Sequence, residues 1–147
     1  MRVAAVGTHT MKTRAIKLLA MSAALAGCPI DVVVDHYGTV EEAREDRLFE
    51  RGWLPDLLPP SAHAIRTANN VDLSTSQGHF EYSDTDAATF FRALELGAPQ
   101  AAPVDGWQVL VRDYRRSGHV AWRYRERLYT WVFFCHPTRD ECDYIQW

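Results

Sequence analysis

Residues 107–124 decide the predicted fold: Trp107-Gln-Val-Leu-Val-Arg-Asp-Tyr114 is followed directly by Arg115-Arg-Ser-Gly118 and then by His119-Val-Ala-Trp-Arg-Tyr124. Apolar and polar residues alternate with a period of two on both sides of the central turn, which predicts a β-hairpin over residues 107–124. Residues 128–134 and 143–147 repeat the pattern. The C-terminal part is therefore predicted to form an antiparallel meander.

Two amphipathic helices are predicted upstream of the meander. Thr39 and Glu42 have the spacing of a capping box, which predicts a helix over residues 40–50. A second helix over residues 83–97 carries an apolar stripe that includes Phe90, Phe91 and Leu94. Short strands are predicted at residues 65–72 and 78–82. The fold class is therefore α+β, an antiparallel sheet of four to six strands covered on one face by two helices.

Composition excludes several classes of protein. The chain has 147 residues, of which 47% are hydrophobic and 12% aromatic, and it has three cysteines. This aromatic content disfavours a disordered chain, and the cysteine count is too low for a disulfide-dense miniprotein. No apolar run reaches the roughly 20 residues of a membrane-spanning helix. One compact domain of residues 39–147 is the natural estimate.

The first 27 residues have the layout of a secretory signal peptide. Three basic residues (Lys12, Arg14 and Lys17) precede the apolar stretch 18–26, and small residues follow it. This order is typical of an export signal, and Met11 is the more typical start for it. The alternative is a buried amphipathic helix in which Cys28 is an ordinary core residue.

Leu25-Ala26-Gly27-Cys28 resembles the lipobox of bacterial lipoproteins. The resemblance implies that the Cys28 thiol receives a diacylglycerol, that cleavage occurs before Cys28, and that the new amino group is acylated. Pro29 stands where an aspartate would favour retention in the inner membrane, so the resemblance implies the periplasmic face of the outer membrane. Residues 28–38 would then be a lipidated tether, although Pro29–His36 is also suited to an edge strand.

A second resemblance lies in the proline-rich segment of residues 40–85. Gly52-Trp-Leu-Pro55, Leu58-Pro59, Ser61-Ala62 and Ile65 are similar to a recurrent pattern in small bacterial lipoproteins. This resemblance supports the same location and domain layout and supplies no mechanism. The segment is interpreted as a proline-braced clamp on the core, and the alternative is a ligand groove built on Trp53.

The net charge of the chain after the predicted signal peptide limits which partners we expect. Four of the sixteen basic residues and none of the nineteen acidic residues lie in residues 1–27, so residues 28–147 have a net charge of −7 and no lysine. An acidic domain is repelled by nucleic acid and by anionic lipid surfaces. We therefore expect no nucleic-acid partner, and we expect membrane attachment through the lipid anchor.

Cys135 and Cys142 flank a six-residue loop near the C-terminus. In an oxidising compartment they are predicted to form a disulfide. The alternative is a metal site that also uses His136, but the spacing matches no common zinc pattern. We predict no metal and no cofactor.

A possible binding face combines arginines and aromatic residues of the predicted sheet: Arg112, Trp122, Arg123, Tyr124 and Arg125. Such residues can stack on an anionic partner and form charge pairs with it. The alternative is that these arginines pair with Asp113, with Glu126 and with the acidic helices.

No local sequence signature predicts catalysis. The histidines after residue 28 are His36, His63, His79, His119 and His136, and His79 beside Glu81 is the best acid–base pair, since the two share a strand face. The predicted function is a lipid-anchored envelope protein with a binding or structural role and an envelope protein as possible partner. The alternatives are a small envelope enzyme with a histidine–carboxylate pair, and an inhibitor or immunity-type protein that uses its acidity to block a basic enzyme.

Overall fold

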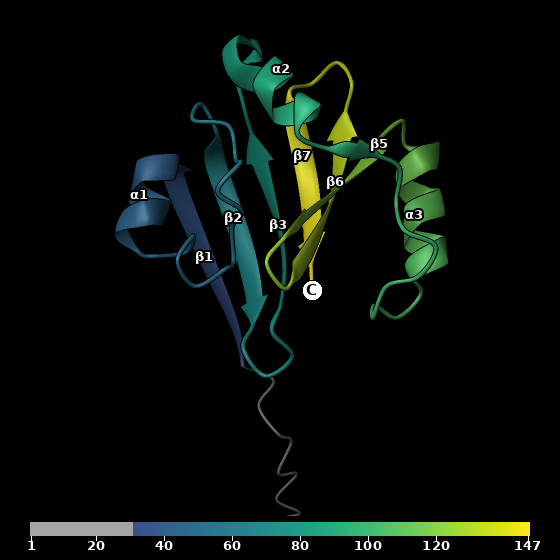
Figure 1. Cartoon of the computed structure of the whole chain (residues 1–147), viewed down its shortest axis with the longest axis horizontal. Helices are drawn as coiled ribbons and strands as arrows, with labels where there is room; N and C mark the ends of the chain where they lie inside the picture. Colours follow the sequence, from purple (N-terminus) through teal and green to yellow (C-terminus); the bar gives the residue numbers. More distant parts are fainter. Residues whose placement is uncertain (1–30) are drawn as a thin grey trace, which may run out of the picture.

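The computed structural model describes residues 31–147, so the predicted signal peptide, Cys28 and the start of the predicted tether lie outside the described residues. It contains one seven-stranded antiparallel sheet with the strand order β1-β2-β3-β7-β6-β5-β4 (Figure 1). The strands are β1 (Val32–Thr39), β2 (His63–Asn70), β3 (Thr75–Glu81), β4 (Glu95–Leu96), β5 (Val120–Glu126), β6 (Tyr129–His136) and β7 (Glu141–Gln146). The helices are α1 (Val40–Glu45), α2 (Asp84–Arg92) and α3 (Trp107–Arg116).

The antiparallel sheet of the predicted α+β fold is present, with more strands than the four to six predicted. Strand β1 uses most of residues 28–38, so this part of the predicted tether is an edge strand paired with β2. Strand β4 has two residues, and the sequence pattern did not predict it. Such a short strand has too few residues to show an alternation.

The hairpin predicted over residues 107–124 is wrong in its first half, because residues 107–116 form helix α3. Trp107, Leu110, Val111 and Tyr114 all pack in one apolar cluster, and their spacing of three and four residues is that of a helix face. Val109 is one of the apolar residues on which the predicted alternation rested, and its side chain is 48% exposed. Only β5 remains of the predicted hairpin, and it pairs with β6 on one side and with the short β4 on the other.

Helices cover both faces of the sheet, whereas the sequence predicted cover on one face. Trp131, Phe133 and Cys135 of β6 point into the larger core cluster, together with apolar residues of α1, of α2 and of the proline-rich segment. Val132 and Phe134 of the same strand point into a second cluster under α3. Because successive side chains of a strand alternate between faces, the interior strand β6 is buried on both sides.

Helix α1 begins as predicted and ends early. The Thr39 hydroxyl accepts a hydrogen bond from the Glu42 backbone N–H at 3.3 Å, and the Glu42 carboxylate accepts one from the Gly38 N–H at 2.6 Å. The helix ends at Glu45 instead of residue 50, and Arg47 takes a φ of 62°. The chain then turns and buries Leu48 in the core.

The proline-rich segment packs on the larger cluster. Leu54, Leu58 and Ala62 are each at most 3% exposed, and the partly buried Trp53 packs against the same cluster. This is the arrangement of a core clamp. Within residues 31–147, no helix combines the length and the apolar character needed to cross a bilayer.

Candidate binding groove

A row of polar side chains crosses four neighbouring strands on the α3 side of the sheet. His36 of β1 lies opposite Arg66 of β2, Arg66 lies opposite His79 of β3, and His79 lies opposite Asp143 of β7. Residues directly opposite in an antiparallel pair share a face, and neighbouring strands lie about 4.8 Å apart. The register thus places four polar side chains side by side over about 14 Å.

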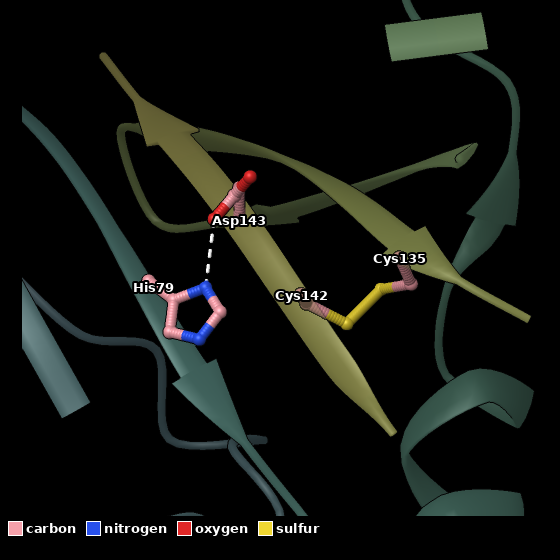
Figure 2. Close-up of a disulfide and its surroundings, with 4 residues drawn as sticks. All are labelled: His79, Cys135, Cys142 and Asp143. Atoms are coloured by element: carbon pink, nitrogen blue, oxygen red, sulfur yellow. Dashed lines mark hydrogen bonds and ion pairs between the residues drawn. A yellow bond between two sulfur atoms is a disulfide. The ribbon is translucent and has the colours of Figure 1, made fainter. Parts of the chain in front are cut away.

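Asp143 is the hydrogen-bonding centre of this row. Its Oδ1 lies 2.8 Å from His79 Nδ1, and Figure 2 shows the imidazole facing the carboxylate across the two strands. The Tyr114 hydroxyl of α3 donates to Asp143 Oδ2 at 3.0 Å. Burial and the neighbouring Asp143 carboxylate raise the pKa of Tyr114 well above its usual value, so the phenol remains a donor at neutral pH.

Both oxygens of Asp143 therefore have partners. Because Asp143 accepts a hydrogen bond from His79 Nδ1, this nitrogen carries the proton. In a neutral ring, Nε2 then has no proton and is an acceptor. Carboxylate-oriented imidazoles of this kind are suited to binding and to proton transfer.

Arg66 is the free charge of the site. Its side chain is exposed, and no ion pair involves it among residues 31–147. Asp143 lies two strands away and is already bonded to His79 and Tyr114. The guanidinium, flanked by two histidines, is the group in this row most available to an anion.

The row lines one end of an open groove between α3 and the sheet. The cavity at the row has a volume of about 330 Å³, and Leu110, Ala68 and Val34 supply apolar wall next to the polar row. A second cavity of about 480 Å³ shares Ala68, Gln77, Leu110 and Ile145 with the first. The two cavities form one elongated groove with a cationic and polar end and a length of mixed lining in which apolar side chains are the more numerous, a usual form for a ligand site.

The structure gives His79 a different partner from the one predicted. His79 bonds to Asp143, whereas Glu81 pairs with His63, whose Nε2 lies 3.4 Å from Glu81 Oε2. The two residues do share a strand face, but the neighbouring strand β7 brings a closer carboxylate. The His63–Glu81 pair is about half exposed and lies outside the groove cavities.

Of the five residues of the predicted binding face, the structure brings three to one cavity, Arg123, Tyr124 and Arg125. Trp122 and Tyr124 pack on the larger core cluster, and Trp122 contacts Phe91 with ring centroids 5.2 Å apart. Arg123 points to the opposite face and pairs with Glu95 at 2.5 Å. Arg112 is on α3, and neither Arg112 nor Trp122 lines the cavity that Arg123, Tyr124 and Arg125 share. The alternation of strand β5 directs Trp122 to the face opposite Arg123 and Arg125.

Cys135 and Cys142 lie at disulfide distance, with an S–S separation of 2.01 Å (Figure 2). They are directly opposite residues of β6 and β7, and both are buried on the α2 side. The bond occupies both thiols that the alternative metal site required. Within residues 31–147, no group of three His, Cys, Asp or Glu side chains is placed to hold a metal ion.

The disulfide and the polar row use consecutive residues of β7. Cys142 points to one face and Asp143 to the other, so the cross-link fixes the strand that carries Asp143.

Residues 31–81 match the family model of the YbbD head domain. The matched segment runs from β1 to β3 and includes α1 and the proline-rich segment, so it supplies His36, Arg66 and His79 of the row. It overlaps the stretch 40–85 on which the lipoprotein resemblance rests, and Cys28 lies outside it. No curated protein and no solved structure matches the chain.

Sequence reasoning missed Arg66, Asp143 and Tyr114 as members of the site. Each comes from a different element, and the register of β2, β3 and β7 decides that they meet. One signal was present: Arg66 directly follows the apolar Ile65 in a predicted short strand, and the alternation of a strand places such a charged side chain on the less buried face.

Proposed function

We propose that this protein is an envelope-anchored binding domain whose groove holds an amphiphilic ligand with an anionic group at Arg66. The observation that supports this proposal most directly is the Arg66 guanidinium, which lies at the polar end of the groove and has no ion-pair partner among residues 31–147. An anionic head would pair with Arg66 and accept from the neighbouring imidazoles when they are protonated. An apolar tail would lie along Leu110, Ala68 and Ile145.

The groove favours an amphiphile over a purely polar ligand because apolar side chains line much of its length, beside polar ones such as Asn70 and Asp105. Val32, Leu73 and Val104 continue the apolar lining beyond the polar row. Burying apolar surface contributes about 25 cal/mol per Å², so a short alkyl chain adds affinity that the anionic group alone lacks. The net charge of −7 over residues 28–147 makes general attraction of anions unfavourable, so binding would depend on the local Arg66 site.

Octanoate, octanol and octylamine test this proposal, because they share a chain length and differ in charge. We expect octanoate to shift the NMR signals of the His79 ring and of the groove backbone at concentrations where octylamine does not. Arg66→Gln should weaken octanoate binding at least tenfold. Arg92→Gln is the matched control, since Arg92 is an exposed, unpaired arginine of α2 on the other face of the sheet. Equal binding of the three probes, or no effect of Arg66→Gln, would overturn the proposal.

Attachment through a lipidated Cys28 is part of the same proposal. It is supported by the basic, apolar and small-residue order of residues 12–28 and by the lipobox resemblance. Two or three acyl chains, at about 0.8 kcal/mol for each buried methylene, would hold the domain stably on a membrane. Incorporation of labelled palmitate into the wild-type chain and not into Cys28→Ser tests this. Membrane fractionation then tests the outer-membrane location.

One observation supports the alternative of a small envelope enzyme. His79 is oriented by Asp143, which is itself bonded to Tyr114, and this chain of groups can assist a general base at Nε2. Hydrolysis of 4-nitrophenyl octanoate tests it. Loss of turnover in His79→Asn, with full turnover in His63→Asn, would favour the enzyme, because His63–Glu81 is a histidine–carboxylate pair outside the groove. Equal rates in both variants would leave binding as the function.

A further inference from the structure

One end of the sheet exposes a group of large apolar side chains. Val32 and Val33 at the start of β1 are 46% and 47% exposed, and Val71 and Leu73 in the turn between β2 and β3 are 54% and 70% exposed. The two segments adjoin, because the Val71 N–H donates to the Asp31 carbonyl at 3.2 Å. We refer to these four residues as the apolar end. Adjacent exposed apolar residues indicate an interaction surface more strongly than isolated ones do.

The apolar end is also the end of the domain nearest to Cys28. Cys28 precedes Asp31 by three residues, and a chain extends at most about 3.6 Å per residue, so their Cα atoms lie within about 11 Å in any conformation. Lipid on Cys28 would therefore hold this end of the sheet next to the membrane surface.

We propose that the apolar end rests in the interface of the membrane and orients the domain on it. This proposal depends on the anchoring through Cys28 proposed above. Valine and leucine side chains at that depth leave water for the boundary between lipid headgroups and acyl chains. Only Val32 and Leu73 are shared with the groove, and the polar row lies farther along the strands from this end.

A third segment, the turn between β5 and β6, lies at the same end of the sheet. Ser76 of β3 pairs with Gln146 of β7, which pairs with Trp131 of β6, so the turn between β5 and β6 is on the side where β3 starts (Figure 1). That turn presents Leu128, which is 94% exposed, next to the exposed Arg127. An apolar side chain beside a cation is suited to a surface of lipid headgroups.

The rival occupant of this surface is a second copy of the chain paired along the edge strand β1. Edge pairing would satisfy the free backbone groups of β1. It would not cover Val71 and Leu73, because they belong to a turn and not to the β1 edge. A membrane surface contacts the strand start and the turn together, so we assign the bilayer as the partner.

The test uses the full lipidated chain, reconstituted into vesicles of phosphatidylethanolamine and phosphatidylglycerol. Leu73→Cys and Leu96→Cys are matched variants, since both leucines are 70% exposed and Leu96 lies in β4 at the other edge of the sheet. With lipid on Cys28 and a disulfide between Cys135 and Cys142, the introduced cysteine is the one free thiol for an NBD fluorophore. We expect NBD at residue 73 to be at least threefold brighter and to be quenched by nitroxide lipids, whereas NBD at residue 96 is not. Equal quenching at both positions would overturn the proposal.

Two further measurements separate this proposal from the anchoring. Labelling of the wild-type chain at Cys28 would show that anchoring fails. The Cys28→Ser form of the Leu73→Cys variant, held on uncharged vesicles by an N-terminal hexahistidine tag and nickel-chelating lipid, then decides the proposal alone: brightening and quenching at residue 73 support it, and their absence overturns it. A fluorescence rise at residue 73 with protein concentration in the absence of vesicles would identify a second copy as the occupant and overturn the membrane proposal.

Discussion

Tyr114 of α3 stacks on Phe134 of β6, with ring centroids 4.1 Å apart and ring planes within 6° of each other. The same Tyr114 side chain donates its hydroxyl proton to Asp143. One residue thus fixes α3 on the sheet through its ring and fixes the polar row through its hydroxyl. The wall of the groove and its hydrogen-bonding centre are therefore both positioned by Tyr114.

Two variants separate these roles of Tyr114. Tyr114→Phe keeps the stacked ring and removes the hydrogen bond to Asp143, so we expect a loss of about 1 kcal/mol in the free energy of unfolding. Tyr114→Leu also removes the stacking, which adds about 0.5 to 1.5 kcal/mol to the loss. Urea unfolding monitored by circular dichroism measures both. Equal stability of the two variants would show that the stacking does not contribute.

Residues 107–116 show why the fold was only partly predictable. Val109 and Val111 are β-branched and alternate with polar residues, which favours a strand. Trp107, Leu110, Val111 and Tyr114 also satisfy a helical period, and packing against Phe134 favours that solution. Residues 119–134 and 143–147 have no competing helical face, and strands there were predicted correctly.

The site was less predictable than the fold, because it depends on strand order. His79 and Asp143 are 64 positions apart in the chain. They meet because β7 inserts between β3 and β6 in the middle of the sheet. A sequence pattern identifies strand faces, but it does not identify which strands are neighbours.

Gly78 allows a close approach at the floor of the groove. A Cβ atom there would lie 2.2 Å from the Arg66 carbonyl oxygen and 2.5 Å from Tyr144 Cε1. Since backbone and a buried ring must then move, we expect Gly78→Ala to cost about 3 kcal/mol, the upper end for overpacking. Gly38→Ala is the control, because its Cβ meets only the flexible Glu42 carboxylate, at 3.2 Å. Thermal unfolding compares the two variants, and similar melting temperatures would contradict this account.

Alkaline pH should destabilise the domain through its tyrosines. Burial raises the pKa of Tyr144 above its usual value, and burial together with Asp140 and Asp84 raises the pKa of Tyr82 to about 12. Below pH 10 these phenols are protonated in both states and the stability is complete. Above pH 10 they ionise first in the unfolded chain, so stability falls by about 1.4 kcal/mol per pH unit for each fully buried tyrosine.

Residues 28–147 contain no lysine, so lysine titration does not obscure this effect. Chemical unfolding at pH 9, 10, 11 and 11.5 measures the slope of stability against pH. Tyr144→Phe is the control, since it removes one fully buried phenol and should reduce the slope above pH 10. A free energy of unfolding that stays constant to pH 11.5 would contradict the raised pKa values.

The disulfide should stabilise the sheet where the polar row crosses it. Closing a loop of about eight residues contributes about 2 to 3 kcal/mol in the chain-entropy description, so the double variant Cys135→Ala/Cys142→Ala should lose that amount. Guanidinium unfolding of wild-type protein with and without reductant checks the same quantity without a change of side-chain volume. Because β6 and β7 are paired at six successive positions, the variant should remain folded at 25 °C and retain the hydrogen bond between His79 and Asp143. Loss of the NMR signature of that bond under reducing conditions that leave the sheet intact would show that the cross-link also positions Asp143.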